Sequence, residues 1–206
     1  MELLTNAWET DYSKRGLLWG GITNDLPELP LGSSVLELGC GNGKTLSAMI
    51  QRGWDVTAVD FSPRAVSLSK KRFKTTSSCE FIVADVRHSL FKKNSFDGIF
   101  AIHIFGHLQK HDRELIPSVL AYNLKPGGIL FFSDFSTDDF RCGSGDEMET
   151  LTFQRGPGII THYFSQKEVI DLFSGLTPLS VKTHQWPMRV RGKNLIRSEI
   201  KAIFTK

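Results

Sequence analysis

The chain has 206 residues, of which 40% are hydrophobic and 23% are charged, as expected for a globular domain of ordinary size. The net charge of +3 is mild, so it permits an acidic partner without pointing to nucleic acid. The longest apolar runs are too short to span a bilayer, and the first residues lack the features of a signal peptide.

The cysteines are scattered along the chain as Cys40, Cys79 and Cys142. Their number is odd and they form no C-x-x-C pair, which argues against a disulfide framework or a cysteine-rich metal site. We therefore expect one domain over residues 1–206, located in the cytoplasm and not in a membrane.

Segments of strand length alternate with segments of helical periodicity, a pattern typical of α/β proteins. Because the apolar segments are short and do not alternate with polar residues, we predict a mostly parallel sheet covered by helices on both faces, a three-layer αβα sandwich. Ser62 and Pro63 are typical of a helix start. In chain order we expect a strand over 34–38, a helix over 44–51, a strand over 55–59, a helix over 62–73, strands over 80–83 and 96–103, a helix over 113–123, a turn at 126–128 and a strand over 129–134.

A polar segment follows the last of these strands. Residues 136–158 are rich in Asp, Ser, Gly and Thr with few periodic apolar positions, so we predict a long excursion or lid that ends near residue 164. Ser165 and Glu168 are spaced as a capping box, which predicts a helix over 165–173.

The C-terminal segments 177–186 and 195–204 have the pattern of two strands around a basic turn. The turn contains Arg189, Arg191 and Lys193. An antiparallel pair at the edge of the sheet is therefore expected. The basic stretch that continues to Arg197 could bind an acidic partner, although a solvated hairpin explains it more simply.

A glycine-rich turn follows the first predicted strand, in the sequence V-L-E-L-G-C-G-N-G over residues 35–43. Gly39, Gly41 and Gly43 permit positive φ angles and a close approach of the backbone to a ligand. Their spacing is G-x-G-x-G and not the G-x-G-x-x-G that accompanies pyrophosphate. A turn of this kind predicts a nucleotide-type ligand only in combination with other signals, because it can also be a tight connection.

Two acidic residues supply those signals. Asp60 ends the second strand about twenty residues after the first glycine, where a carboxylate can accept the hydroxyls of a ribose; alternatively it caps the next helix. Asp85 follows the third strand, where it can accept a hydrogen bond from an adenine amino group while Val86 contacts the ring. All these strand ends meet at the carboxyl edge of a parallel sheet.

Four further motifs follow the glycine turn in order: V-T-A-V-D-F-S over 56–62, F-I-V-A-D-V over 81–86, F-D-G-I-F-A-I-H over 96–103 and L-K-P-G-G-I-L over 124–130. Together with the turn, they make the sequence resemble the class I, Rossmann-like S-adenosylmethionine-dependent methyltransferases. The resemblance covers about residues 33–135. It implies a seven-stranded sheet whose C-terminal strand is antiparallel. It also implies S-adenosylmethionine as cofactor. Gly39 and Gly41 would hold its methionine part, Asp60 its ribose, and Phe61, Asp85 and Val86 its adenine. Glu37 would orient the glycine turn or reach the amino group of the cofactor, and Cys40 and Ile102 would also line the cofactor site.

The N-terminal segment, residues 1–30, precedes the first strand and is rich in aromatic residues. In many small-molecule methyltransferases such a segment covers the cofactor, which makes Tyr12, Arg15 and Trp19 candidates for that role. Arg15 could pair with a carboxylate. Ordinary packing of these residues against the sheet is an equal alternative.

Methyl transfer to an amine, hydroxyl, thiol or acidic carbon can require a base near the methyl group. His103 and His107 follow the fourth strand and are the candidates; the alternative is that one packs under the cofactor and the other caps a helix. The N-P-P-Y type of motif found in enzymes that methylate amino groups of bases is missing here. His103, His107 and His111 are spaced by four residues, but no acid nearby completes a metal site, and we expect no metal.

The triplet His162-Tyr163-Phe164 resembles the same step in methyltransferases related to tellurite-resistance and small-molecule enzymes. Its side chains would face the acceptor pocket or pack in the core. We favour a small-molecule methyltransferase. The alternatives are a methyltransferase acting on a protein or a tRNA, and a module that binds S-adenosylmethionine without catalysis.

Overall fold

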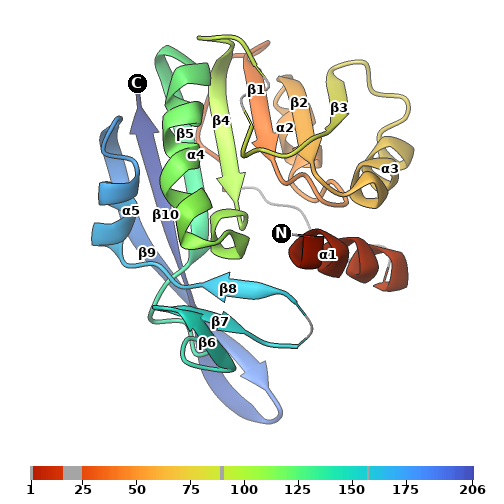
Figure 1. Ribbon diagram of the computed structural model, residues 1–206. Helices are drawn as coiled ribbons and strands as arrows, with labels where there is room; N and C mark the ends of the chain where they lie inside the picture. The colour runs from red at the N-terminus through yellow and green to blue at the C-terminus, as the bar shows by residue number, and fades with distance from the viewer. Residues whose placement is uncertain (1, 16–24, 89–90, 157) are drawn as a thin grey trace.

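A computed structural model describes residues 2–15, 25–88, 91–156 and 158–206, without the side chains of residues 2–6 and 15. A seven-stranded sheet forms its centre, in the order β3-β2-β1-β4-β5-β10-β9 (Figure 1). All pairs from β3 to β5 are parallel, and β10 runs antiparallel to both of its neighbours. The strands are β1 Ser34–Leu38, β2 Asp55–Asp60, β3 Cys79–Val83, β4 Phe96–Ile102, β5 Leu124–Phe135, β9 Thr177–Val190 and β10 Lys193–Thr205. The predicted sheet and its antiparallel strand are confirmed.

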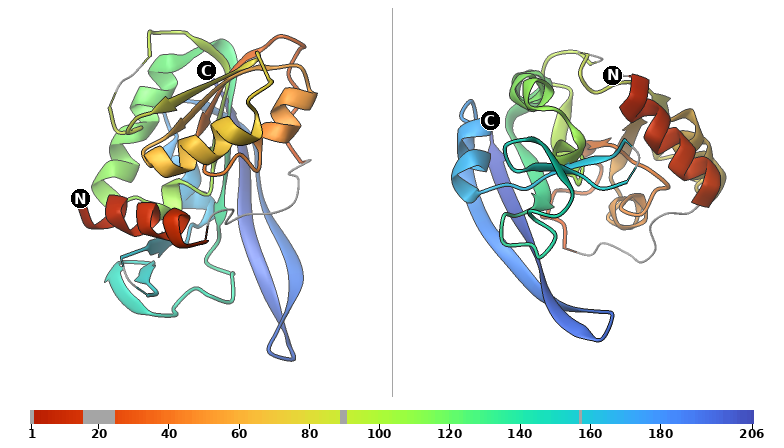
Figure 2. Two further views of the ribbon diagram at one scale, coloured as in Figure 1. Left: turned by 90° about the vertical axis from the view of Figure 1, so that its right-hand side faces the viewer. Right: turned by 60° about the horizontal axis from the view of Figure 1, so that its bottom comes forward.

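Helices lie on both faces of the sheet and beside its carboxyl edge (Figures 1 and 2). One face carries α4 and α5, and the other carries α2 and α3, while α1 lies below the ends of the parallel strands. The bounds are α1 Glu2–Arg15, α2 Leu46–Gln51, α3 Pro63–Arg72, the 3-10 turn η1 Phe105–His107, α4 Lys110–Asn123 and α5 Gln166–Leu172. None of the helices in the described ranges is both long enough and apolar enough to cross a lipid bilayer.

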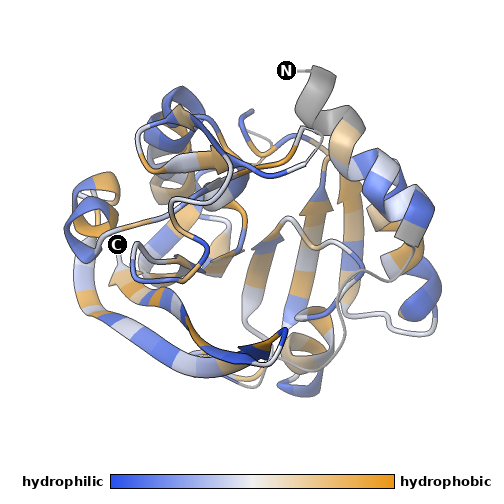
Figure 3. Cartoon of the chain, turned by 90° about the horizontal axis from the view of Figure 1, so that it is seen from below, coloured by the Kyte–Doolittle hydropathy of each residue, from blue (hydrophilic) through white to orange (hydrophobic). Residues whose placement is uncertain are grey.

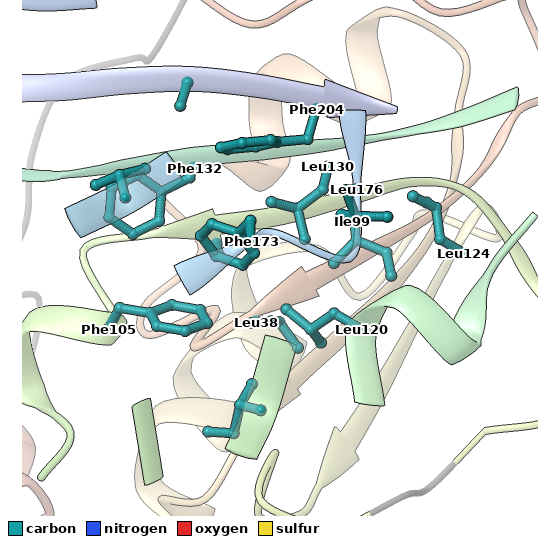
Figure 4. Packing of buried hydrophobic residues seen from close by; sticks show 14 of the residues in the cluster. Leu38, Ile99, Phe105, Leu120, Leu124, Leu130, Phe132, Phe173, Leu176 and Phe204 are labelled. Atoms are coloured by element: carbon teal, nitrogen blue, oxygen red, sulfur yellow. The ribbon is translucent and has the colours of Figure 1, made fainter. Parts of the chain in front are cut away.

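Two apolar cores, one on each face, explain why the central strands are apolar without alternation. In β5, Leu130 and Phe132 join the core under α4 and α5, whereas Phe131 between them joins the core under α2. Neighbouring side chains of a strand point to opposite faces, so a sheet buried on both sides needs apolar residues at successive positions. In the first core the rings of Phe132 and Phe173 lie 5.6 Å apart, among the leucines shown in Figure 4.

Several predicted boundaries were wrong. Helix α4 begins at Lys110 and not at residue 113, and β4 ends at Ile102 because His103 has a φ of +53°. The Pro-Gly-Gly segment is not a turn before β5 but an irregularity within it, since Leu124 already pairs with Phe96. Leu124 is fully buried, and this pairing in register with β4 is a tertiary contact that local turn residues do not reveal.

The polar excursion was expected to be irregular and instead contains a small antiparallel sheet. Its strands are β6 Asp146–Glu149, β7 Thr152–Gln154 and β8 Ile160–His162, and they lie below the carboxyl edge of the main sheet (Figure 1). The capping box is half formed: the Ser165 hydroxyl accepts from the Glu168 amide, but the Glu168 carboxylate lies 2.8 Å from Nε2 of His162. A buried histidine partner thus outweighs the local cap.

The C-terminal hairpin is longer than predicted. Its turn is reduced to Arg191 and Gly192, both with positive φ, and such two-residue turns fit the twist of the strands. Arg189 and Lys193 therefore belong to β9 and β10. The hairpin projects beyond the helices (Figure 2), and polar and apolar segments alternate along it (Figure 3).

Replacing Phe132 by Ala tests the core under α4 and α5. Phe132 is fully buried and its ring contacts Phe105, Phe164 and Phe173, so we expect the free energy of unfolding to fall by about 3–5 kcal/mol. Urea denaturation measures the change. Leu115→Ala is the control, because Leu115 is 53% exposed and its loss should stay within about 0.5 kcal/mol; equal effects of the two substitutions would contradict the packing.

Candidate functional site

The carboxyl ends of the parallel strands open onto a cavity of about 750 Å³. Its walls combine strand ends with α1, the excursion and the β9–β10 hairpin. The structure brings together at this cavity the following predicted residues: Tyr12, Glu37, Gly39, Cys40, Gly41, Asp60, Phe61, Asp85, Val86, Ile102, His103 and His107. Trp19 and the side chain of Arg15 lie outside the described residues.

The glycine turn presents bare backbone to the cavity. Gly39 and Gly41 have φ angles of +67° and +53°. A Cβ atom on Gly41 would lie 2.5 Å from the hydroxyl of Tyr12, and one on Gly39 would lie 3.0 Å from a methyl of Ile104. Glycine is therefore required at both positions, by the backbone conformation and by the space that remains.

The Asp60 carboxylate connects this turn to the next helix. One oxygen accepts the Gly41 amide and the other accepts the Ser62 amide, both at 2.9 Å. The Ser62 hydroxyl in turn caps α3 by accepting the Ala65 amide. Burial raises the pKa of Asp60, and the two backbone hydrogen bonds oppose that rise. The cap of α3 is therefore Ser62 and not Asp60. Each carboxylate oxygen of Asp60 can accept a further hydrogen bond, which leaves a ligand-binding role open to it.

Glu37 is a buried carboxylate without a full set of partners. It is 3% exposed, and its Oε2 atom has no hydrogen-bond partner among the described residues. Burial raises the pKa of Glu37 to about 8, against the effect of a hydrogen bond from Thr45. An unpaired carboxylate at this depth is costly, and a cation arriving from the cavity would satisfy it. The ammonium group of a methionine moiety fits this requirement.

Asp85 already has a partner in the structure. Its carboxylate lies 2.8 Å from Nε of Arg87. The Nη1 atom of the same arginine lies 3.4 Å from Asp112. Burial opposes the charge of Asp85, but the Arg87 guanidinium holds its pKa below the ordinary value. The carboxylate is thereby fixed as an acceptor at the cavity wall, next to the apolar side chain of Val86.

Helix α1 covers the same end of the cavity. Glu9 binds the Ser62 hydroxyl and lies 3.4 Å from the Arg64 amide, which ties α1 to the start of α3. The Trp8 ring packs edge-on against the His107 ring, with centroids 4.8 Å apart. Tyr12 of the same helix is buried, and its hydroxyl lies against Gly41.

His103 lies directly after the C-terminal end of β4, between two carboxylates. Its Nδ1 atom is 3.7 Å from Asp134 and its Nε2 atom is 3.6 Å from Glu199, while its ring stacks on Phe135 at 4.6 Å. Burial works against the charge of Asp134, but the neighbouring His103 ring and the Gly106 amide keep its pKa below the ordinary value. A positive φ at a non-glycine residue beside a cavity is a strained arrangement of the kind that clusters at functional sites.

His107 has a different environment. Its Nδ1 atom is 2.7 Å from the Ile160 carbonyl of β8, and burial lowers its pKa. The ring therefore holds η1 against the excursion in its neutral form. His111 lies apart on α4, and the described part of the chain contains no group of three or more His, Cys, Asp or Glu residues that could hold a metal ion.

Sequence reasoning missed most of the other half of the cavity, which is formed by β5, the excursion and the hairpin. Phe135, Arg141, Trp186 and Glu199 line the cavity but belong to no shared motif. The residues on strands share only their register, since Glu199 on β10 pairs with Phe135 on β5, and register becomes visible only after the strands have been aligned.

Comparisons with known proteins identify methyltransferases as the similar proteins. A family model described as a methyltransferase domain matches residues 35–128. O-methyltransferase 3 of Dictyostelium discoideum is 25% identical over 183 residues, covering 82% of this chain and 40% of that protein. The tRNA N(3)-methylcytidine methyltransferase Mettl2 of Drosophila melanogaster is 30% identical over 190 residues, covering 84% and 58%. The chain thus spans about half the length of these relatives.

A solved S-adenosylmethionine-dependent methyltransferase of Methanosarcina mazei has the same fold. The TM-score is 0.69 at 21% identity, with 86% of this chain and 94% of that chain covered. The relatives differ in their acceptors, so the similarity does not single out the tellurite-resistance branch. Residues 35–128 thus match a methyltransferase domain, and the chain shares the fold of a solved methyltransferase.

Proposed function

We propose that the protein transfers a methyl group from S-adenosylmethionine to a small molecule held in the same cavity. The observation that carries the proposal is the pairing of the bare glycine backbone with the buried, partly unpartnered carboxylate of Glu37. A cavity of about 750 Å³ is at the upper part of the range for ligand pockets, which supports room for a cofactor and a compact acceptor. Helix α1 and the excursion, acting as a lid, would exclude water.

The residues of the glycine end would hold the cofactor. Glu37 pairs with the ammonium group, the bare backbone at Gly39 and Gly41 lies against the methionine part, and Asp60 accepts the ribose hydroxyls. Asp85 and Val86 receive the adenine. Bound S-adenosylmethionine supplies a methyl group that is already activated by its sulfonium, so the protein needs mainly to align the acceptor.

His103 is the proposed base. Its Nε2 atom faces the cavity side, where it would take the proton of an N–H, O–H or S–H acceptor, and Asp134 and Glu199 would stabilise the resulting imidazolium. His107 is not a base in this proposal, because its ring is engaged with the Ile160 carbonyl and Trp8. Its role is to fasten the lid.

A tRNA acceptor is the second candidate, and the β9–β10 hairpin favours it. The hairpin carries a single acidic residue, Glu199, and its Trp186 side chain reaches the cavity. A polyanion bound along it would lie next to the proposed active site. One of the relatives, Mettl2, is named for methylation of tRNA. The basic side chains of the hairpin are Lys182, Arg189, Arg191, Lys193, Arg197 and Lys201.

Calorimetry with S-adenosylmethionine and S-adenosylhomocysteine tests the cofactor seat. Asp60→Ala removes the acceptor of two backbone amides and of the ribose, so we expect at least a tenfold loss of affinity, about 1.4 kcal/mol or more. Asp97→Ala is the matched control, because Asp97 also accepts a strand amide, that of Ser34, but does not line the cavity. Failure of the unaltered protein to bind either compound would sink the assignment.

Glu37 predicts a pH effect on both stability and binding. With a pKa of about 8 in the cofactor-free protein, Glu37 is protonated at pH 7, whereas it ionises near 4.5 when unfolded. Its contribution to the free energy of unfolding is therefore lost as the pH rises from about 4.5 to about 8. Binding of S-adenosylhomocysteine at pH 7 should ionise Glu37 and release about one proton.

Calorimetric titrations in buffers with different ionisation enthalpies measure that proton. Glu37→Gln keeps the shape of the side chain and should bind without proton release. Identical proton release by the two proteins would show that Glu37 does not face the ammonium group.

A labelled-methyl screen identifies the acceptor and tests His103. Cell extract is divided into small-molecule, RNA and protein fractions, and label in the first fraction is expected. With the labelled fraction as acceptor, His103→Gln should lower the rate by about 10²–10⁴-fold without changing affinity for S-adenosylhomocysteine. An unchanged rate would leave alignment alone as the source of catalysis, and label in the RNA fraction only would favour the second candidate.

A further inference from the structure

Three arginines line the cavity at the end away from the glycine turn. Arg141 and Arg155 come from the excursion and Arg197 from β10. The guanidinium carbons of Arg141 and Arg197 lie 4.0 Å and 4.6 Å from the centre of the Phe135 ring. Arg141 and Arg197, which lie far apart in the chain, thus converge on one aromatic ring. Together with Arg155, which lines the same cavity, these residues are called the arginine corner: Phe135, Arg141, Arg155 and Arg197.

A structural role explains only part of this arrangement. The Nε atoms of Arg141 and Arg197 donate to the two oxygens of Asp139, at 2.8 Å and 2.6 Å. Asp139 is buried, so this ion pair braces the excursion against β10. These ion pairs use the Nε atoms of Arg141 and Arg197, so the terminal guanidinium nitrogens do not bind Asp139. The Nη2 atom of Arg141 is buried and has no acceptor in the described part of the chain, and Nη1 of Arg197 contacts only the Met188 sulfur, at 3.7 Å.

One donor of the corner therefore lacks a partner. Buried donors are nearly always paired in proteins, so the unpartnered Nη2 atom of Arg141, whose side chain lines the cavity, indicates a missing acceptor.

The charge of the corner has the sign and size of a counterion for phosphate. Arg141 and Arg197 around the single carboxylate of Asp139 leave a net charge of +1, and Arg155, which lines the same cavity, adds a further positive charge. The other acidic groups at this end, Asp25 and Glu199, are both bound to Lys201. A phosphate monoester carries about −1.5 to −2 at neutral pH and offers three acceptor oxygens, and guanidinium forks match its geometry.

We propose that the arginine corner binds a phosphate group of the methyl acceptor. This inference rests on the proposed function, because it assumes that the acceptor occupies this half of the cavity. The part of the acceptor that receives the methyl group would then lie between the phosphate and His103. The charge match favours a free phosphomonoester. An RNA backbone phosphate, a diester with a single negative charge, is the other source of the same chemistry, and the test separates the two.

Phenyl phosphate is the probe for the free source, and bulk tRNA is the probe for the RNA source. Binding of each is measured by calorimetry, with and without saturating S-adenosylhomocysteine. Arg155→Gln removes an exposed charge, and Arg141→Lys keeps the charge beside Asp139 but removes the guanidinium fork. Arg64→Gln is the matched control, since Arg64 is exposed on α3 and does not line the cavity. Thermal melting shows whether each variant is folded. If Arg141→Lys does not fold, Arg155→Gln still tests the proposal.

Phenyl phosphate should bind the unaltered protein, and both corner variants should weaken it at least about fivefold while Arg64→Gln leaves it unchanged. If phenyl phosphate does not bind but the corner variants alone weaken tRNA binding, the phosphate is that of RNA and the proposal stands. If neither probe responds to the corner variants, the proposal is overturned. Binding of S-adenosylhomocysteine by the same preparations separates this outcome from failure of the proposed function.

Discussion

The carboxylate of Asp60 is the contact on which the cofactor end of the cavity depends. It accepts the amides of Gly41 and Ser62, and so joins the turn after β1 to the start of α3. The Ser69 hydroxyl of α3 returns a hydrogen bond to the Gly41 carbonyl at 2.8 Å. Because an unpaired backbone amide at this depth is unfavourable, the turn, the strand end and the helix hold one another in a single conformation. The proposed seat is therefore formed before any ligand arrives.

The sheet order gives the cavity two chemically different ends. The order β2-β1-β4-β5-β10 places the glycine turn and its carboxylates at one end and the hairpin with its arginines at the other. His103 follows β4, between them. Acidic groups suited to the ammonium and hydroxyls of a cofactor are thus separated from basic groups suited to an anionic acceptor, by the width of the strands between them. His107 contacts both β8 of the excursion and Trp8 of α1, and so connects two of the segments that form the wall of the cavity.

Local sequence signals predicted the elements whose causes are local. Ser62 and Pro63 start α3 as expected, and the strand ends carry Asp60 and Asp85 where the motifs placed them. The predictions failed where a distant partner competes with a local pattern. Glu168 binds His162 in place of completing its cap, and β5 begins before the Pro-Gly-Gly segment because Leu124 pairs with Phe96. The polar excursion contains a sheet that its composition did not predict, because β7 pairs with both β6 and β8.

The sequence by itself determined the α/β class, the glycine turn and the acidic strand ends, because each depends on residue types at short, fixed spacings. Only the tertiary structure decided that Glu37 is buried without a full set of partners, that His103 lies between two carboxylates while His107 contacts the Ile160 carbonyl, and that Arg141 and Arg197 share Asp139. These properties arise from burial and from strand register, which combine residues far apart in the chain, and no local spacing encodes them.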